Sequence, residues 1–382
     1  MNRHNLQKLA MPLALFAICA FFALKEPAFL GSRNLTQLLI EFAMIGTLSV
    51  GMLLVLLTGN IDLSVGSGVG LIGGIAAVLV FRFEWPAFAA MLAGLGVALV
   101  AWLAIGWLVV AQRIPSFIIT LGGLLVFKGA FWLVISDSTI PVAPGDSDNL
   151  YSALTTYYLP DAAGYVVAAI VSAALAMIAW QQSRERRQLG LDAGAGNKAP
   201  QQWRYVAGAA AVFGLVAICN GFRGVPLALI ILSTVALLIY FLTAHTPFGR
   251  YLYAIGGNTE AAVLSGINTF KVTIWAYVIL GATVAITGLM TTAYSGASTS
   301  TVGELMELDA VAACVIGGTS LRGGRGGVVG VLFGALVMTA LLNGMTLMAV
   351  SPELKFIARG TILTLAVWLD VALSRASGSQ LS

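Results

Sequence analysis

The sequence predicts an all-α integral membrane protein, a polytopic helical bundle of about ten spans (range about ten to twelve) with broken or re-entrant segments. Of the 382 residues, 59% are hydrophobic and only 9% are charged, and the mean hydropathy is +0.94. An ordinary globular protein carries about 25% charged residues, so this chain cannot cover a water-facing surface of normal size. A soluble enzyme, a disordered chain and a nucleic-acid-binding domain are thereby excluded. Apolar stretches long enough to span as helices favour a bundle over an outer-membrane barrel, whose strands alternate over about 10 residues.

The apolar stretches define the spans of one transmembrane domain over residues 1–382. The candidate spans are residues 9–24, 37–58, 65–81, 87–111, 115–135, 162–180, 205–219, 225–243, 272–294, 327–349 and 355–373. A shorter piece, 308–321, is interpreted as a span, a half-helix or a re-entrant segment. No small-residue cleavage signature follows the first stretch, so it is expected to be a retained span.

Orientation follows from the basic residues in short loops, which favour the cytoplasmic side. The 183–204 insert carries Arg184, Arg186, Arg187, Lys198 and Arg204, so it is expected to be cytoplasmic. The 136–161 loop has aspartates and no basic residue, and the 295–307 loop has two glutamates, so both are expected outside. The 245–268 loop, with Arg250, returns to the cytoplasm, and both termini are expected there.

A weak internal similarity relates the two halves. AWLAIGWLVVAQRIPSFIITLGG (101–123) resembles TALLNGMTLMAVSPELKFIARGT (339–361), and Asp62 and Asp309 each precede an Ile-Gly-Gly. Transporters are often built from such repeats. Two explanations stay open, a true duplication and a shared composition of Gly-rich and Leu-rich helices.

The loop 245–268, HTPFGRYLYAIGGNTEAAVLSGIN, holds the most specific pattern. Glu260, Ala261 and Ala262 followed by Gly266 predict a small-residue face on a short helix, with the acidic residue near its positive end. Asn258 or Thr259 is expected to cap that helix, and Gly256-Gly257 to provide the turn before it. Such a helix fits closely into a groove on a soluble partner. The alternative is an ordinary surface loop with an interfacial helix.

Polar residues inside the spans are costly in lipid and usually face a cavity. Those embedded here are Glu41, Asn60, Asp62, Lys128, Asp309, Asn343 and Asp370. The run GNIDLSVGS (59–67) predicts a helix ending near Gly59 and another capped by Asp62 or Ser64, with the break facing the pathway. Asp62 is a structural cap, a contact to a transported solute, or both, and Asp309 plays the matching part in the second half. The candidate pathway residues are Asn60, Asp62, Ser64, Ser67, Asp309 and Asn343, each with helix packing as its alternative role.

Neither a metal site nor an ATP site is predicted in this chain. Its three cysteines lie in apolar stretches without ligand spacing, and its two histidines fall in separate connections. A phosphate-binding Walker loop needs Gly-Lys before Ser or Thr, and none of the six lysines follows a glycine. We therefore expect no catalytic residues and no cofactor in this chain.

The Glu-Ala-Ala-three residues-Gly pattern resembles the conserved cytoplasmic loop of bacterial ABC importer permeases. GNIDLSVGS (59–67), IPSFIITLGG (114–123) and ELDAVAACVIGGTSLRGG (307–324) are similar to blocks of the ribose/xylose monosaccharide permeases, so the resemblance covers nearly the whole chain. Within that family, the 183–204 insert and LTLAVWLDVAL (363–373) most resemble the D-xylose members. Gly59-Asn60 stands where Ala-Glu is expected in those members, which leaves the pentose open.

The resemblance implies a bacterial inner-membrane permease that imports a monosaccharide, most closely D-xylose, as one half of a symmetric homodimer. Its implied partners are an ABC ATPase subunit and a periplasmic sugar-binding protein, with the lipid bilayer around it and no nucleic acid. The residues implied for coupling to the ATPase are Arg250, Gly256, Gly257, Asn258, Glu260, Ala261, Ala262 and Gly266.

Two alternatives to this reading stay open. One is a permease of the same family for ribose, galactose or a nucleoside. The other is a proton-coupled secondary sugar transporter, which the embedded carboxylates Glu41, Asp62 and Asp309 would serve.

Overall fold

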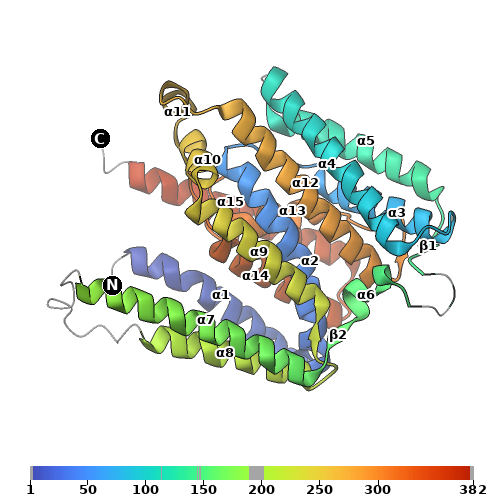
Figure 1. Ribbon diagram of the computed structural model, residues 1–382, viewed down its shortest axis with the longest axis horizontal. Coiled ribbons are helices and arrows are strands. Elements are labelled where there is room, and N and C mark those ends of the chain that lie inside the picture. The colour runs from blue at the N-terminus through green and yellow to red at the C-terminus, as the bar shows by residue number, and fades with distance from the viewer. Residues whose placement is uncertain (1–2, 113, 144, 146–147, 189–201, 379–382) are drawn as a thin grey trace.

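The computed structural model describes residues 3–112, 114–143, 145, 148–188 and 202–378, and nearly all of its regular structure is helical (Figure 1). Among these residues, six helices are long and apolar enough to cross a membrane: α2 (Ser32–Leu57), α4 (Ala87–Gln112), α5 (Ser116–Ile135), α9 (Leu227–His245), α12 (Thr269–Tyr294) and α14 (Val328–Leu347). Beside them lie helices that are shorter or carry polar ends: α1 (Arg3–Lys25), α3 (Val65–Phe81), α7 (Asp161–Gln188), α8 (Gln202–Asn220) and α15 (Pro352–Gly378). The predicted polytopic helical fold is confirmed.

One end of the bundle is closed by short connections between distant segments. β1 (Ile140–Pro141) pairs antiparallel with β4 (Ala297–Ser298), and β2 (Tyr158–Leu159) pairs antiparallel with β3 (Val225–Pro226). The short helices η1 (Pro27–Leu30) and α6 (Leu150–Thr156) also lie here. The Tyr151 hydroxyl of α6 donates to the Gly73 carbonyl at 2.9 Å, which anchors α6 on α3. The 136–161 and 295–307 loops thus share one end, as their lack of basic residues predicts.

The opposite end carries α10 (Pro247–Gly257) and α11 (Thr259–Leu264), the two helices of the 245–268 loop. Helices α7 and α15 also end at this end, and α8 begins there (Figure 1). The 183–204 insert lies largely outside the described residues. The described parts agree with the predicted arrangement of loops on two sides.

Two crossings are broken. Helix α2 ends at Leu57 and α3 begins only at Val65, so the chain between them is extended within the bundle. Helix α13 (Met306–Ile316) has 11 residues, about 16 Å of helix, too short for a hydrocarbon core of about 30 Å. The chain before it lies at the β1–β4 end and Gly323 after it lies against α10 at the opposite end, so of the three options for 308–321 the half-helix is correct.

The starts of the two half-helices meet. A Cβ placed on Gly66, in the first turn of α3, would lie 2.7 Å from the Gly303 carbonyl oxygen and would overlap the Glu307 carboxylate of α13. Around this meeting point, the long helix of each half packs on the other half. Helix α12 packs along α3 and α4, and the corresponding helix α2 packs along α13 and α14. Likewise α3 contacts α5 and α13 contacts α15. This exchange pattern favours a true duplication of α2–α5 as α12–α15 over a mere likeness of composition.

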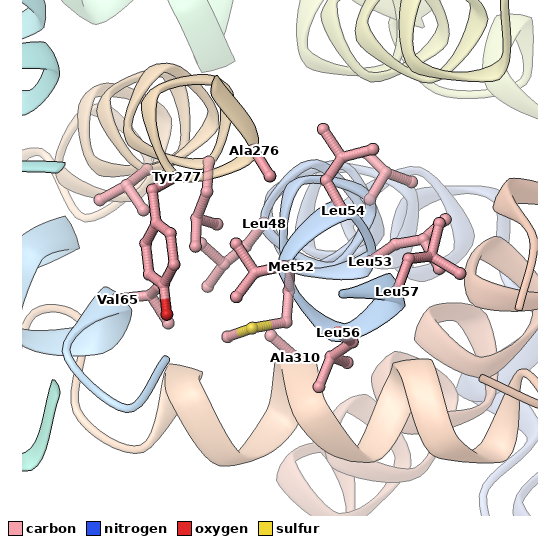
Figure 2. Close-up of a cluster of buried hydrophobic side chains, with 14 of the residues drawn as sticks. Leu48, Met52, Leu53, Leu54, Leu56, Leu57, Val65, Ala276, Tyr277 and Ala310 are labelled. Atoms are coloured by element: carbon pink, nitrogen blue, oxygen red, sulfur yellow. The ribbon is translucent and has the colours of Figure 1, made fainter. Parts of the chain in front are cut away.

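The core centres on α2. Every residue from Met52 to Leu57 is fully buried, so this end of the helix is apolar all round, as expected of a central element. Figure 2 shows its side chains leaving the helix on several sides, toward Val65, Ala276, Tyr277 and Ala310. The first break therefore begins at a fully buried end of α2.

Candidate coupling surface and buried polar centres

Helices α10 and α11 are joined by one residue that caps the second of them. The Thr246 hydroxyl accepts from the Gly249 N–H at 3.5 Å at the start of α10. The Asn258 side chain accepts from the Ala261 N–H at 3.0 Å, so of the two candidate caps of α11 it is Asn258 that acts. Thr259 instead donates its hydroxyl back to the Ile255 carbonyl of α10 at 2.8 Å.

The end of α11 explains why Glu-Ala-Ala is followed by Gly after three residues. Gly266 has φ +79°, a left-handed conformation that glycine adopts without steric cost. The Gly266 N–H donates to the Val263 carbonyl and the Ile267 N–H donates to the Ala262 carbonyl, which together form a Schellman motif. Ala262 and Ile267 both contact the main core, the apolar contact that usually accompanies this motif.

The predicted small-residue face of α11 is wrong for Ala262 alone, because Glu260, Ala261 and Gly266 are exposed as predicted. Ala262 is 4% exposed and faces the core, because α11 lies directly on the bundle. The surface of α11 is instead formed by Glu260, Ala261, Val263 and Leu264, of which Leu264 is 89% exposed. Sequence reasoning missed Val263 and Leu264, although two adjacent apolar residues in a polar connection were a usable signal.

The predicted turn at Gly256-Gly257 is also wrong, because both glycines are the last residues of α10. A Cβ on Gly256 would overlap the Leu57 carbonyl oxygen and the Gly324 backbone nitrogen, whereas nothing lies within 4 Å of Gly257. One turn earlier, the Tyr253 hydroxyl donates to the Gly326 carbonyl at 3.0 Å, and burial raises the pKa of this phenol, so it stays a donor. Arg250 is exposed on the same helix.

The first buried polar centre is built around Asp62, which is 0% exposed. Its Oδ1 accepts from the Ser64 N–H at 2.7 Å and from the Ser64 hydroxyl at 2.6 Å, and its Oδ2 accepts from the Trp102 indole N–H of α4 at 2.9 Å. The helix break is thus placed where the sequence predicts. Asp62 holds it, since Ser64, at the N-cap position of α3, makes no capping hydrogen bond of its own.

The second centre lies at the start of α13 and is charged. Arg359 Nε of α15 is 3.1 Å from Asp309 Oδ1, with side chains 23% and 2% exposed. Close by, Lys128 Nζ of α5 is 3.8 Å from Glu304 Oε1, with side chains 37% and 42% exposed. Arg359 was missed by the sequence analysis, although it lies within a stretch that was predicted to span the membrane.

A third centre joins α2, α12 and α14. The Asn343 carbonyl oxygen accepts from Asn34 at 2.9 Å, and its amide donates to Glu41 Oε2 at 3.2 Å. The Tyr294 hydroxyl donates to Glu41 Oε1 at 3.2 Å. The six candidate pathway residues therefore do not converge on one site: Asp62 and Ser64 lie in the first centre, Asp309 in the second and Asn343 in the third.

The two remaining candidates lie apart from these centres. Asn60 donates its amide to the Thr58 hydroxyl at 2.9 Å, which ties it to the end of α2. Ser67 is half-buried in the first turn of α3. Both residues belong to the first break without contacting its carboxylate through any hydrogen bond described here.

Comparison with known proteins gives one family. The family model described as branched-chain amino acid transport system / permease component matches residues 34–367. The xylose transport system permease protein XylH of Escherichia coli K12 is 40% identical over 98% of this chain and 94% of its own length, and that of Haemophilus influenzae is 39% identical over 96% and 97%. The ribose import permease protein RbsC of Bacillus subtilis is 31% identical over 96% and 93%. No solved structure matches the chain.

Proposed function

The chain belongs to the permease family of branched-chain amino acid transport system components, and on this premise we propose that it is the membrane subunit of an ATP-driven importer of D-xylose. It is a multi-pass transport permease and not an enzyme. The choice of D-xylose rests on sequence identity. The chain is 40% identical to a xylose permease over 98% of its length, and 31% identical to a ribose permease over 94%. Both groups of relatives are named for a pentose, which supports a substrate of that size.

The second centre supports a pathway at the surface of one copy. The side chain of Lys128, on α5, is 37% exposed. The side chain of Glu304, in the segment before α13 that approaches the start of α3, is 42% exposed. A charge exposed to hydrocarbon is costly, so this face points to water or to another protein chain. Two-fold symmetry is the commonest solution for identical subunits, so we assign the facing chain to a second copy, with the sugar passing between them.

The surface of α11 supports a docking role toward a separate ATPase subunit. The exposed Val263 and Leu264 form an apolar tip at the end of the bundle that holds the basic loops, and Glu260 lies at its edge. Its capped start and Schellman end keep the helix rigid without help from a partner. In this proposal ATP and Mg²⁺ bind to the partner, α11 faces the cytoplasm of a bacterial inner membrane, and a periplasmic binding protein delivers the sugar.

Purification from native membranes and reconstitution tests the whole proposal. A tag on this chain should co-purify an ATPase subunit, and vesicles containing the complex and the binding protein should accumulate D-xylose only with ATP on the α11 side. D-ribose and D-galactose serve as competitors in the same assay. Leu264→Glu should reduce co-purification strongly, whereas Leu150→Glu, at an exposed leucine of α6 at the opposite end of the bundle, should leave it unchanged.

Three results would contradict parts of the proposal. Concentrative uptake by this chain alone under a proton gradient would establish a secondary transporter. Preferential competition by D-ribose or D-galactose would reassign the substrate within the family. Wild-type ATPase recovery with Leu264→Glu would remove the docking role of the α11 tip.

A further inference from the structure

Four glycines from three separate segments meet at backbone distance beneath α10. Gly59 follows α2, Gly256 lies near the end of α10, and Gly323 and Gly324 lie in the loop between α13 and α14. A Cβ on Gly323 would lie 2.7 Å from the Gly59 nitrogen and 2.9 Å from the Gly256 Cα. We call these four residues, with the Leu57 carbonyl, the glycine junction.

The glycine junction is held by a backbone hydrogen bond across segments far apart in the chain. The Gly324 N–H donates to the Leu57 carbonyl at 3.0 Å, and Gly256 lies against both groups. A side chain at Gly256 would occupy the space of this bond, so glycine is required there for close approach. The Tyr253 hydroxyl adds a second connection from α10 to the same loop through the Gly326 carbonyl.

The segments that meet here are the inner connections of both broken crossings. Gly59 starts the extended stretch that leads to Asp62 and the start of α3. Gly323 and Gly324 follow α13, whose first turn carries Asp309. Because Asn258 alone joins α10 to α11, a displacement of α11 acts on α10 within one residue.

We infer that Gly256 is a positioning residue through which movement of α11 reaches the two half-helices at once. The inference rests on the proposed function, since it needs a partner that displaces α11. It assigns the transmission to direct backbone contact at the glycine junction, with the Tyr253 hydroxyl as a second connection between α10 and the loop after α13.

The test compares alanine at three glycines in the complex purified from native membranes. Gly256→Ala places a methyl group in the glycine junction. Gly257→Ala changes the next residue of the same helix, where nothing lies within 4 Å, and Gly96→Ala does the same within α4. Alanine favours helix over glycine at all three positions, so the variants differ in what the methyl group meets.

With Gly256→Ala we expect ATPase recovery and basal ATP hydrolysis within twofold of wild type. Stimulation of hydrolysis by the xylose-loaded binding protein, and xylose uptake, should fall at least tenfold. Gly257→Ala should keep more than half of both, and Gly96→Ala should match wild type. Tyr253→Phe, which removes one hydroxyl and adds no bulk, should lower stimulation severalfold with recovery unchanged.

The outcomes separate this inference from the proposed function. If wild-type complex shows no ATP-dependent uptake, the proposed function fails. If wild type transports and Gly256→Ala transports equally well, the inference is overturned. It is also overturned if Gly256→Ala loses ATPase recovery and basal hydrolysis together while Tyr253→Phe behaves as wild type, because the junction would then serve folding alone.

Discussion

The two half-helices carry their buried carboxylates in opposite ways. Asp62, before α3, is fully buried and receives three hydrogen bonds from uncharged donors on Ser64 and Trp102. Asp309, in the first turn of α13, faces the guanidinium of Arg359, which is itself 23% exposed. The pattern of helix contacts is shared, but the first break is sealed inside the bundle and the second reaches its surface.

This difference gives the two breaks different roles: the first is held in a fixed shape, and the second is available for transport. Neutral donors satisfy a carboxylate without bringing further charge into the bundle, so the first break keeps one shape. A partly exposed ion pair beside Lys128 and Glu304 places charges where a polar solute can reach them. We therefore expect substitutions at the first centre to act mainly on stability. At the second centre we expect the exposed Lys128 and Glu304 to act mainly on transport, whereas the buried Asp309 needs Arg359 for stability.

The largest effect is expected for Arg359→Met, which leaves the Asp309 carboxylate buried and unpaired. Breaking a buried pair costs about 3–5 kcal/mol, and the partial exposure of Arg359 favours the lower end, about 3 kcal/mol. Unfolding in mixed micelles by denaturing detergent measures it. The double variant Asp309→Asn/Arg359→Met should recover most of the loss, and a single variant within about 1 kcal/mol of wild type would show that the pair is not buried.

Asp62→Leu is expected next, with a loss of at least about 2 kcal/mol, because the Ser64 and Trp102 donors lose their acceptor and each unpaired donor costs about 1–3 kcal/mol. Asp62→Asn keeps an acceptor for Ser64 but turns an amide toward the Trp102 N–H. It should be intermediate in stability and retain substantial uptake. Equal losses for Leu and Asn, measured by the same unfolding assay, would instead indicate that the carboxylate charge itself is needed.

Gly66→Ala tests whether the two breaks meet. The added methyl group would overlap the Glu307 carboxylate and crowd the Gly303 carbonyl, and overpacking costs about 1–3 kcal/mol. Gly122→Ala on α5 is the control, since nothing lies within 4 Å of it. Apparent melting temperatures of the two variants should move in opposite directions, because alanine favours an open helix position by about 1 kcal/mol. Similar shifts in both would place the half-helix starts apart.

The smallest effect on stability is expected for Lys128→Met. Exposed ion pairs contribute about 0–1 kcal/mol, so the melting temperature should scarcely change. Uptake of D-xylose should nevertheless fall, because Glu304 then lacks its counter-charge on the proposed pathway, and Lys128→Arg should restore most of it. Normal uptake by the Lys128→Met protein would instead indicate that this face contacts lipid.

The spans were predictable from the sequence because hydropathy is a local property, whereas the polar centres were not. Asp62 was singled out, but its partner Trp102 lies 40 residues away and belongs to a helix whose facing side only the packing decides. Asp309 and Arg359 are 50 residues apart for the same reason. The error at Ala262 has another cause: a small residue fits equally well against a partner or against its own bundle, and composition does not distinguish the two. The error at Gly256 arose because a Gly-Gly pair is typical of a turn, whereas here Gly256 gives α10 its close approach to Leu57 and Gly324.

The ribbon that joins Ile140 to Ser298 sets an order of events during synthesis. Its strands lie 158 residues apart (298 minus 140), so at about 5–20 residues per second the ribosome needs roughly 8 to 30 s between them. During that interval the early helices are already in the bilayer and β1 is unpaired. Trp102, by contrast, is synthesised before β1, so Asp62 has its partner early. The nascent chain can therefore form the Asp62–Trp102 contact before its second half is made, but the end of the bundle that carries β1 can close only after β4 has been synthesised.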